Sequence, residues 1–273
     1  MSGVLALILL VGLALWCAGS LYMYLTQTKK FFPANGIAFG MHPSLQTIHG
    51  TAQTLEQDGL GLRWYQIPAA GSTVGWIIVY HGNRDGAYER IEYAEHLVAA
   101  GMNVVLAEYP GYAGDSAAVG EWPILRHALA IYDAIAPQCK GLPLFLLGES
   151  LGTAPATFVA SRRPCKGLVL STPYTSMAAV AAHRYPLLPV GPLTRHRLQA
   201  ELWAPHVSAP VLVLQGTKDR TIPFAMARTQ AGHFSRLRNF VSIPGAGHGN
   251  IRSHAPGLYW DSIRDFLQGC LNA

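Results

Sequence analysis

The stretch Leu144-Phe-Leu-Leu-Gly-Glu-Ser-Leu-Gly152 places a Gly-x-Ser-x-Gly motif directly after a short apolar run. The four leading apolar residues predict a strand buried on both faces, and helical periodicity follows over 151–161. In a turn from strand to helix, glycines two residues to either side of a serine leave room for a sharp bend. The amino end of the helix also favours negative charge beside the serine. The pattern predicts that Ser150 is a nucleophile; a serine that only shapes the turn is the alternative.

Similar apolar runs recur along the chain and alternate with segments of helical periodicity. They predict strands over 74–80, 103–107, 144–147, 167–170, 211–214 and 240–243, and helices over 88–100, 123–135, 151–161, 224–233 and 257–267. Such alternation predicts an α/β sheet with helices on both faces. Upstream, two strand-like segments (51–57 and 60–67) flank Asp58-Gly59, which favours a two-residue hairpin turn. We therefore expect a mostly parallel sheet that begins with an antiparallel hairpin.

Two later loops supply the partners that a serine nucleophile requires. Asp219 follows the run 211–214, and His248 lies in the glycine-rich loop after the run 240–243. Parallel strands end at one edge of a sheet, so the three side chains can meet there. A histidine that takes the hydroxyl proton, and a carboxylate that holds the histidine, activate a serine. We predict Ser150, His248 and Asp219 as catalytic residues; a turn-forming aspartate and a loop histidine without a role are the alternatives.

The segment Val79-Tyr-His-Gly-Asn83 ends an early strand and supplies a loop near the predicted nucleophile. In a hydrolase built this way, one backbone N–H from this loop and one from the residue after the nucleophile bind the oxyanion. We assign these two N–H groups to Asn83 and Leu151. We expect His81 to brace the loop by hydrogen bonding rather than to transfer protons.

One connection is much longer than the others. Residues 175–207 separate two predicted strands, contain four prolines, and have room for short helices at 177–184 and 193–202. An insertion of this size on the carboxyl side of a sheet is usually a lid or cap over a site. Simple covering of the sheet edge is the alternative.

The first 28 residues carry no charged side chain. The apolar run 4–25 would extend about 33 Å as a helix, enough for a hydrocarbon core of about 30 Å. Aromatic residues in its second half, followed by Lys29-Lys30, are typical of an interface anchor. We predict a single transmembrane anchor over 1–30. A cleaved signal peptide, with Ala18-Gly19-Ser20 as its cleavage site, is the alternative.

The position of the two lysines after the helix favours a cytoplasmic location for the rest of the chain. A cleaved signal peptide would instead make the protein secreted or periplasmic. Residues 31–44, punctuated by Pro33, Gly36, Gly40 and Pro43, predict a linker. No second linker is visible, so we predict one domain over 45–273, with the insertion at 175–207 as its cap.

Composition excludes several classes of protein. The chain has 273 residues, of which 50% are hydrophobic and 13% charged, with a formal net charge of +5. Few charges and many apolar residues argue against disorder. The basic residues form no long tract, which argues against nucleic-acid binding. The four cysteines include no Cys-x-x-Cys pair, so the sequence indicates neither a disulfide framework nor a zinc motif. We expect no metal and no cofactor.

Several separated blocks resemble the α/β-hydrolase superfamily, and more narrowly its membrane-anchored "alpha/beta hydrolase domain-containing" serine hydrolases. These blocks are the turn around Ser150, His-Gly-Asn at 81–83, Tyr-Pro-Gly-Tyr-Ala-Gly-Asp-Ser at 109–116, Lys-Asp-x-x-Ile-Pro at 218–223 and Gly-Ala-Gly-His at 245–248. The resemblance implies the α/β-hydrolase fold, an eight-stranded sheet with a short helical cap. It also implies hydrolysis of an ester or thioester through a Ser-His-Asp triad and an acyl-enzyme.

The anchor and the apolar, proline-rich segment 185–190 favour a lipidic acyl group, carried by a lipid or by an acylated protein. Two alternatives stay open. One is a serine peptidase or amidase with the same fold. The other is a binding or scaffold protein that keeps the fold without turnover.

Overall fold

Eight strands form one sheet in the order β1-β2-β4-β3-β5-β6-β7-β8. The structure is a computed structural model, and it describes residues 2–34, 37–40, 44–84 and 86–273. The strands are β1 (Thr51–Gln57), β2 (Leu60–Ile67), β3 (Gly75–Tyr80), β4 (Met102–Ala107), β5 (Leu144–Glu149), β6 (Leu168–Ser171), β7 (Val211–Gly216) and β8 (Leu237–Ile243). β2 pairs antiparallel with β1 and β4, and all other pairs are parallel. The predicted fold class is confirmed.

The hairpin turn between β1 and β2 lies where the sequence predicts it. Asp58 and Gly59 have φ values of 51° and 71°, the left-handed pair that a two-residue turn of type I′ requires. The strands pair without a break from Thr51↔Gln66 to Gln57↔Leu60. The turn therefore sets the register of the antiparallel edge.

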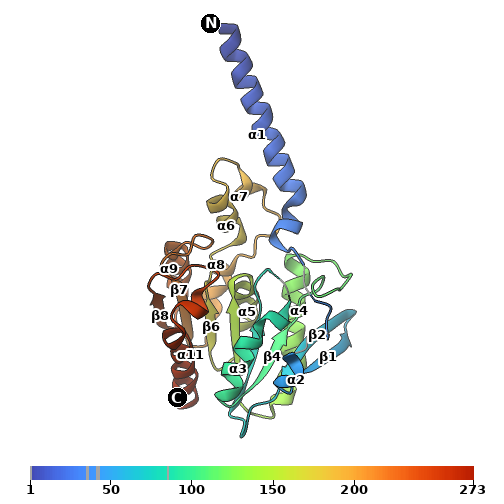
Figure 1. Cartoon of the computed structure of the whole chain (residues 1–273), viewed down its shortest axis with the longest axis vertical. Coiled ribbons are helices and arrows are strands. Elements are labelled where there is room, and N and C mark those ends of the chain that lie inside the picture. The colour runs from blue at the N-terminus through green and yellow to red at the C-terminus, as the bar shows by residue number, and fades with distance from the viewer. Residues whose placement is uncertain (1, 35–36, 41–43, 85) are drawn as a thin grey trace.

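Helices cover both faces of the sheet (Figure 1). Their bounds are α1 (Ser2–Phe31), α2 (Ser44–Thr47), α3 (Ile91–Ala99), α4 (Glu121–Ile135), α5 (Thr153–Ala160), α6 (Met177–Arg184), α7 (Val190–Leu193), α8 (Ala200–Trp203), α9 (Phe224–Gly232), α10 (Ile251–His254) and α11 (Pro256–Leu271). Single 3₁₀ turns are η1 (Ala87–Arg90), η2 (Ala136–Cys139), η3 (Ser150–Gly152) and η4 (Ala204–His206). Buried residues of α4 and α5 belong to one apolar layer, and those of α3 and α11 to the other.

The central strands contribute to both layers. On β3, Ile78 and Tyr80 belong to the layer with α4 and α5, whereas Ile77 and Val79 belong to the layer with α3 and α11. A strand covered on both faces needs apolar residues at every position. This explains why the runs that predict the parallel strands do not alternate with polar residues.

Residues 175–207, the predicted cap, lie between β6 and β7 and are called the cap below. They contain one helix as predicted and one that differs. α6 matches the predicted 177–184, but the predicted helix 193–202 is wrong, because only the single turns α7 and α8 form there. Between them the N–H groups of Arg197 and Leu198 donate to the Glu121 carboxylate. These N–H groups are therefore bound outside the segment and do not support a continuous helix.

α1 is a 30-residue helix whose first half stands away from the rest of the chain (Figure 1). It is the one helix, among the residues described, that is long and apolar enough to cross a membrane. Phe32, which follows α1, is only 1% exposed and lies in the apolar layer shared with α4 and α5. The predicted linker 31–44 stays a prediction, and its Gly36 and Pro43 lie outside the described residues.

His127, on the buried face of α4, makes stability depend on pH. Burial lowers the pKa of His127 to about 4, and its Nδ1 has no hydrogen-bond partner. Between pH 6.5 and 4 the unfolded chain therefore binds more protons than the folded chain, so stability falls as pH falls. We expect a loss of about 2 kcal/mol between pH 7.5 and pH 5 from this group.

The loss is measured by denaturant unfolding in detergent at both pH values. The variant His127→Gln keeps a polar side chain that does not titrate, so its stability should fall by about 2 kcal/mol less than that of the native chain. Equal losses in the two proteins would show that His127 is not the group responsible.

Candidate active site

Ser150 lies in a sharp turn between β5 and α5. Its φ is 51°, a value that residues other than glycine rarely adopt. The flanking glycines are required by close backbone contacts. A Cβ at Gly152 would lie 2.0 Å from the carbonyl oxygen of Tyr80, and one at Gly148 would lie 2.4 Å from the carbonyl oxygen of Gly152. Only glycine fits at either position, and the turn projects Ser150 at the carboxyl edge of the sheet.

The loops after β5, β7 and β8 bring the predicted catalytic side chains together. Ser150 Oγ lies 2.9 Å from His248 Nε2, and His248 Nδ1 lies 2.8 Å from Asp219 Oδ2. The Asp219 side chain is fully buried, whereas that of His248 is partly open to solvent. This hydroxyl–imidazole–carboxylate chain has the geometry to remove a proton from Ser150. The described part of the chain holds no group of three or more His, Cys, Asp or Glu side chains that could bind a metal ion.

The Asp219 carboxylate is held by more groups than the sequence suggests. Its Oδ1 accepts hydrogen bonds from the N–H groups of Thr221 (2.8 Å) and Ile222 (2.9 Å). Its Oδ2 accepts one from the Gln215 side chain at 3.2 Å, in addition to His248. Gln215 is fully buried in β7 and was not predicted. A single polar residue at the end of the apolar run Val-Leu-Val-Leu-Gln is the signal that could have found it.

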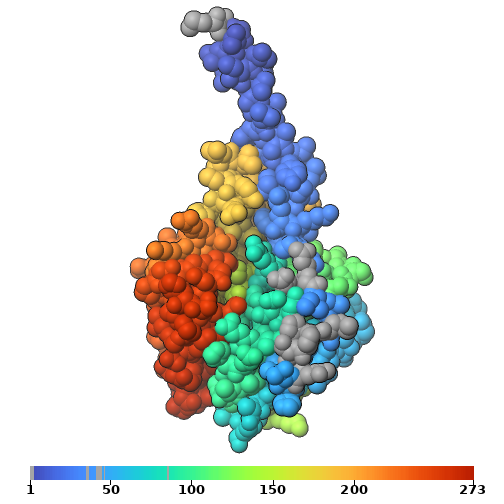
Figure 2. Space-filling view, viewed as in Figure 1, coloured from blue at the N-terminus to red at the C-terminus, as the bar shows by residue number. Residues whose placement is uncertain are grey.

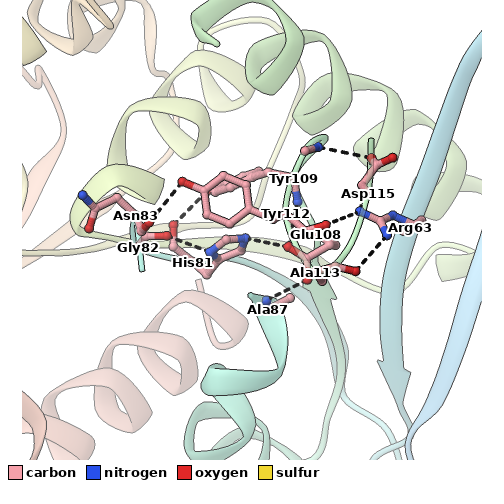
Figure 3. Close-up of polar contacts among 11 residues, drawn as sticks. Arg63, His81, Gly82, Asn83, Ala87, Glu108, Tyr109, Tyr112, Ala113 and Asp115 are labelled. Carbon is pink, nitrogen blue, oxygen red and sulfur yellow. Dashed lines mark hydrogen bonds and ion pairs between the residues drawn. The ribbon is translucent and has the colours of Figure 1, made fainter. Parts of the chain in front are cut away.

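The loop that carries Asn83 is held through three consecutive carbonyl groups (Figure 3). Tyr109 donates to the carbonyl of His81 (2.9 Å), Tyr112 donates to that of Asn83 (3.1 Å), and His81 Nδ1 lies 2.7 Å from that of Gly82. The Gly82 carbonyl and the Asn83 N–H point in opposite directions across one planar peptide. The Asn83 N–H therefore points away from the His81 ring.

The same loop lies beside Ser150. A Cβ at Gly82 would lie 3.7 Å from Ser150 Cβ, and Leu151 directly follows Ser150 in the turn. Both residues predicted to bind the oxyanion are thus in segments that meet at Ser150. Their role in binding an oxyanion stays a prediction.

His81 has the bracing contacts that the sequence predicts. Besides its contact with the Gly82 carbonyl, its Nε2 lies 3.1 Å from Glu108 Oε1 (Figure 3). Glu108 is buried at the end of β4 and also accepts hydrogen bonds from the N–H groups of Ala87 and Tyr109. A buried carboxylate needs such partners. Here they connect the His-Gly-Asn loop to the start of η1.

Glu149, next to Ser150, belongs to an ion-pair network that the sequence did not reveal. Its carboxylate contacts Arg90 Nη2 at 3.1 Å and Arg252 Nη1 at 2.5 Å, and Arg252 Nε contacts Glu92 at 2.8 Å. Burial opposes ionisation of Glu149, but the two guanidinium groups outweigh it and lower the pKa of its carboxyl below the usual value. Because Arg252 follows His248 by four residues, the network connects the turn at Ser150 to the loop that carries His248.

Replacing Arg252 with glutamine is expected to lower kcat about 10- to 100-fold with little change in KM. The loss of charge frees α10 from Glu149 and loosens the position of His248, and small displacements of catalytic groups cost rates of this order. Arg264→Gln is the matched control, since Arg264 forms exposed ion pairs on α11 and such pairs contribute little. A folded Arg252→Gln variant with unchanged kcat would contradict this positioning role.

Comparison with known proteins places the chain among hydrolases. The family model for serine aminopeptidase, S33, matches residues 71–199. An uncharacterised protein of Mycobacterium tuberculosis is 30% identical over 262 residues, which cover 93% of this chain and 92% of that protein. Lysophosphatidylserine lipase ABHD12 of Macaca fascicularis is 27% identical over 197 residues, 65% of this chain and 49% of that protein.

A solved structure gives the same fold over the whole chain. It is described as a membrane phospholipase A, a novel bacterial virulence factor, and superposes with a TM-score of 0.65 at 18% identity. The match covers 100% of this chain and 99% of that one. The esterase Pf2001 of Pyrococcus furiosus has a TM-score of 0.69 at 14% identity, covering 86% of this chain and 97% of that one.

Proposed function

This chain belongs to the α/β-hydrolase superfamily, and we propose on that premise that it is a serine hydrolase cleaving carboxylic esters of lipidic acyl groups. The observation that carries the proposal is the hydrogen-bonded chain from Ser150 through His248 to Asp219. Lipase and esterase relatives support a lipid ester as substrate. A thioester on an acylated protein would be cleaved through the same acyl-enzyme and belongs to the same proposal.

The proposed reaction depends on the two hydrogen bonds that join Ser150 to His248 and His248 to Asp219. Ser150 Oγ attacks the acyl carbon while His248 Nε2 takes its proton, and Asp219 stabilises the imidazolium that forms. The N–H groups of Asn83 and Leu151 bind the oxyanion. His248 then protonates the leaving alcohol or thiol, which departs and leaves the acyl group on Ser150. Water gives a proton to His248 and attacks this ester, and the acid is released as Ser150 regains its proton.

We also propose that α1 anchors the protein as a single membrane span. Cleavage at 18–20 would remove Trp16, whose indole N–H donates to the carbonyl of Leu187 at 2.8 Å. This contact between α1 and the folded domain supports retention of the segment over cleavage. Lys29 and Lys30 at the end of α1 favour a cytoplasmic catalytic domain.

Substrate preference tests the proposal against its closest rival. The purified chain in detergent is given p-nitrophenyl esters of increasing acyl length, a lysophospholipid, an acyl thioester and aminoacyl amides. We expect ester turnover to exceed amide turnover and to rise with acyl length beyond acetate. Preference for amides would favour the peptidase that the matched family model names. No turnover of any substrate by folded protein would favour a scaffold.

A further inference from the structure

One face of α1 lies along the cap (Figure 2). Ser20, Met23 and Gln27 are buried on this face, whereas most other residues of the helix are exposed. Met23 packs in an apolar cluster with Ala181 of α6 and Val190 of α7. The spacing of three to four residues is that of one helical face, so α1 and the cap are packed side by side.

Hydrogen bonds of two α1 residues, Gln27 and Trp16, show how far the cap extends along α1. Gln27 accepts a hydrogen bond from the N–H of Arg195 at 2.7 Å and donates to the carbonyl of Leu193 at 3.3 Å. Further along α1, the Trp16 indole N–H donates to the carbonyl of Leu187 at 2.8 Å. At 1.5 Å per residue, the rise from Gln27 to Trp16 is about 16 Å. The cap therefore follows α1 for three helical turns.

The contact at Trp16 places the end of the cap at the level of lipid. Trp16 lies within the apolar run 4–25, and about 13 Å of helix separates it from Leu25. A bilayer whose hydrocarbon core of about 30 Å is spanned by this run would hold the Leu187 carbonyl well inside the leaflet nearer the domain. We call residues 185–189, between α6 and α7, the tip loop.

The tip loop has the composition and hydrogen bonding that lipid requires. Its sequence is Tyr-Pro-Leu-Leu-Pro, and Leu187 is 86% exposed. The two prolines have no N–H, and two of the other three N–H groups, those of Tyr185 and Leu188, donate to backbone carbonyls. Trp16 satisfies the Leu187 carbonyl. Unpaired backbone groups are costly in hydrocarbon, and most of the backbone N–H groups here are paired or absent. The tip loop is therefore suited to lipid, whereas the exposed Leu187 side chain is not stabilised in water.

The predicted oxyanion loop lies at the same end of the domain. The Asn83 side-chain amide donates to the carbonyl of Phe31, the last residue of α1, at 3.4 Å. Exposed cations lie around this end, among them Lys30 and Arg195, where they can reach lipid phosphates. Arg184, beside the tip loop, is also exposed and is long enough to extend toward the same phosphates.

We infer that the tip loop inserts into the acyl layer of the leaflet nearer the domain, beside α1, and that the cap thereby holds the catalytic edge against the membrane surface. This inference rests on the proposed anchoring by α1. Its partner is the acyl chains of a phospholipid leaflet. A substrate with its acyl chain in that leaflet could approach Ser150 along the cap without leaving the membrane.

The test attaches a nitroxide to Leu187→Cys in the full chain, after Cys17 and Cys165 are replaced by alanine. The labelled protein is reconstituted in vesicles of phosphatidylcholine and phosphatidylglycerol. Collision of the nitroxide with oxygen, which concentrates in lipid, is compared with collision with a water-soluble nickel chelate. Leu202→Cys is the matched control, because Leu202 is an exposed leucine of the cap on α8, which packs against α5. We expect oxygen to dominate at 187 and nickel to dominate at 202.

Nickel access at 187 equal to that at 202, in protein that floats with its vesicles, would overturn the inference and leave anchoring and hydrolysis standing. Failure to float would overturn the anchoring and, with it, insertion of the tip loop. As a second variant, Leu187→Asp should lower hydrolysis of a vesicle-borne lysophospholipid about tenfold and leave p-nitrophenyl acetate hydrolysis unchanged. Equal losses on both substrates would contradict a role at the membrane.

Discussion

Replacing Ser150 with alanine is expected to lower kcat/KM for ester hydrolysis by about 10⁴- to 10⁶-fold. The reason is that Ser150 Oγ, 2.9 Å from His248 Nε2, is the atom proposed to form the bond to the acyl carbon. A fluorophosphonate probe reports the same chemistry directly, since it binds covalently to an activated serine. Labelling should disappear in Ser150→Ala.

Ser161 provides the control for this experiment. It follows the last residue of α5, at the opposite end of the helix from Ser150, so Ser161→Ala should keep both activity and labelling. Undiminished labelling of Ser150→Ala would show that the nucleophile is another residue and would remove the basis of the proposed mechanism.

The backbone conformation of Ser150 also affects the stability of the fold. With a φ of 51°, Ser150 is in a conformation that costs a residue with a Cβ about 1 kcal/mol and glycine almost nothing. Both Ser150→Ala and Ser150→Gly lose the hydroxyl, but only the glycine variant relieves the backbone strain at position 150. We expect Ser150→Gly to unfold at a higher temperature than Ser150→Ala, by the equivalent of about 1 kcal/mol.

Replacing Asp219 with asparagine is expected to lower kcat by about 10⁴-fold. The surroundings of the carboxylate decide how the amide must lie. Oδ1 accepts two backbone N–H groups, so the amide oxygen takes that position and the amide NH₂ takes the position facing His248. The imidazole must then accept at Nδ1 and carry its hydrogen on Nε2, where it cannot remove the proton of Ser150.

Asp219→Asn should still react slowly with the fluorophosphonate probe, because Ser150 itself is unchanged. This separates it from Ser150→Ala. Asp265→Asn serves as control, since Asp265 is an exposed carboxylate on α11 and has no role in the proposed mechanism. If Asp219→Asn kept more than about a tenth of the native kcat, orientation of the imidazole by this carboxylate would be ruled out.

The parts of the fold that were predictable depend on local pattern. The parallel strands and the hairpin follow from buried apolar runs and from Asp58-Gly59, each of which is visible in a short window of sequence. The first residues of β8 were missed because Leu237 and its neighbours are exposed on an edge strand, so they lack the apolar run typical of the central strands. The false helix at 193–202 arose because Glu121, distant in sequence, binds its N–H groups.

In the candidate site, too, the features set by local pattern were predictable and those set by distant contacts were not. Ser150, Asp219 and His248 were predictable because each follows a recognisable strand, and parallel strands bring their ends together. The contacts that hold them were not, because they join distant positions. Glu149 and Arg252 are separated by 103 residues, and nothing in the sequence around either residue indicates the other. Gln215 supports Asp219 from a strand where only its polarity, among apolar neighbours, distinguishes it.

If α1 anchors the chain as proposed, the burial of Phe32 bears on whether proteolysis could release the folded domain from the membrane. A cut on the C-terminal side of Phe32 would remove an aromatic ring that is 1% exposed in the core, and loss of a buried phenylalanine costs about 3–5 kcal/mol. That is a large part of the 5–15 kcal/mol by which a typical domain is stable. Such a cut would therefore destabilise the domain, and under the proposed anchoring by α1 we expect the proposed hydrolysis to stay confined to the membrane that holds the chain.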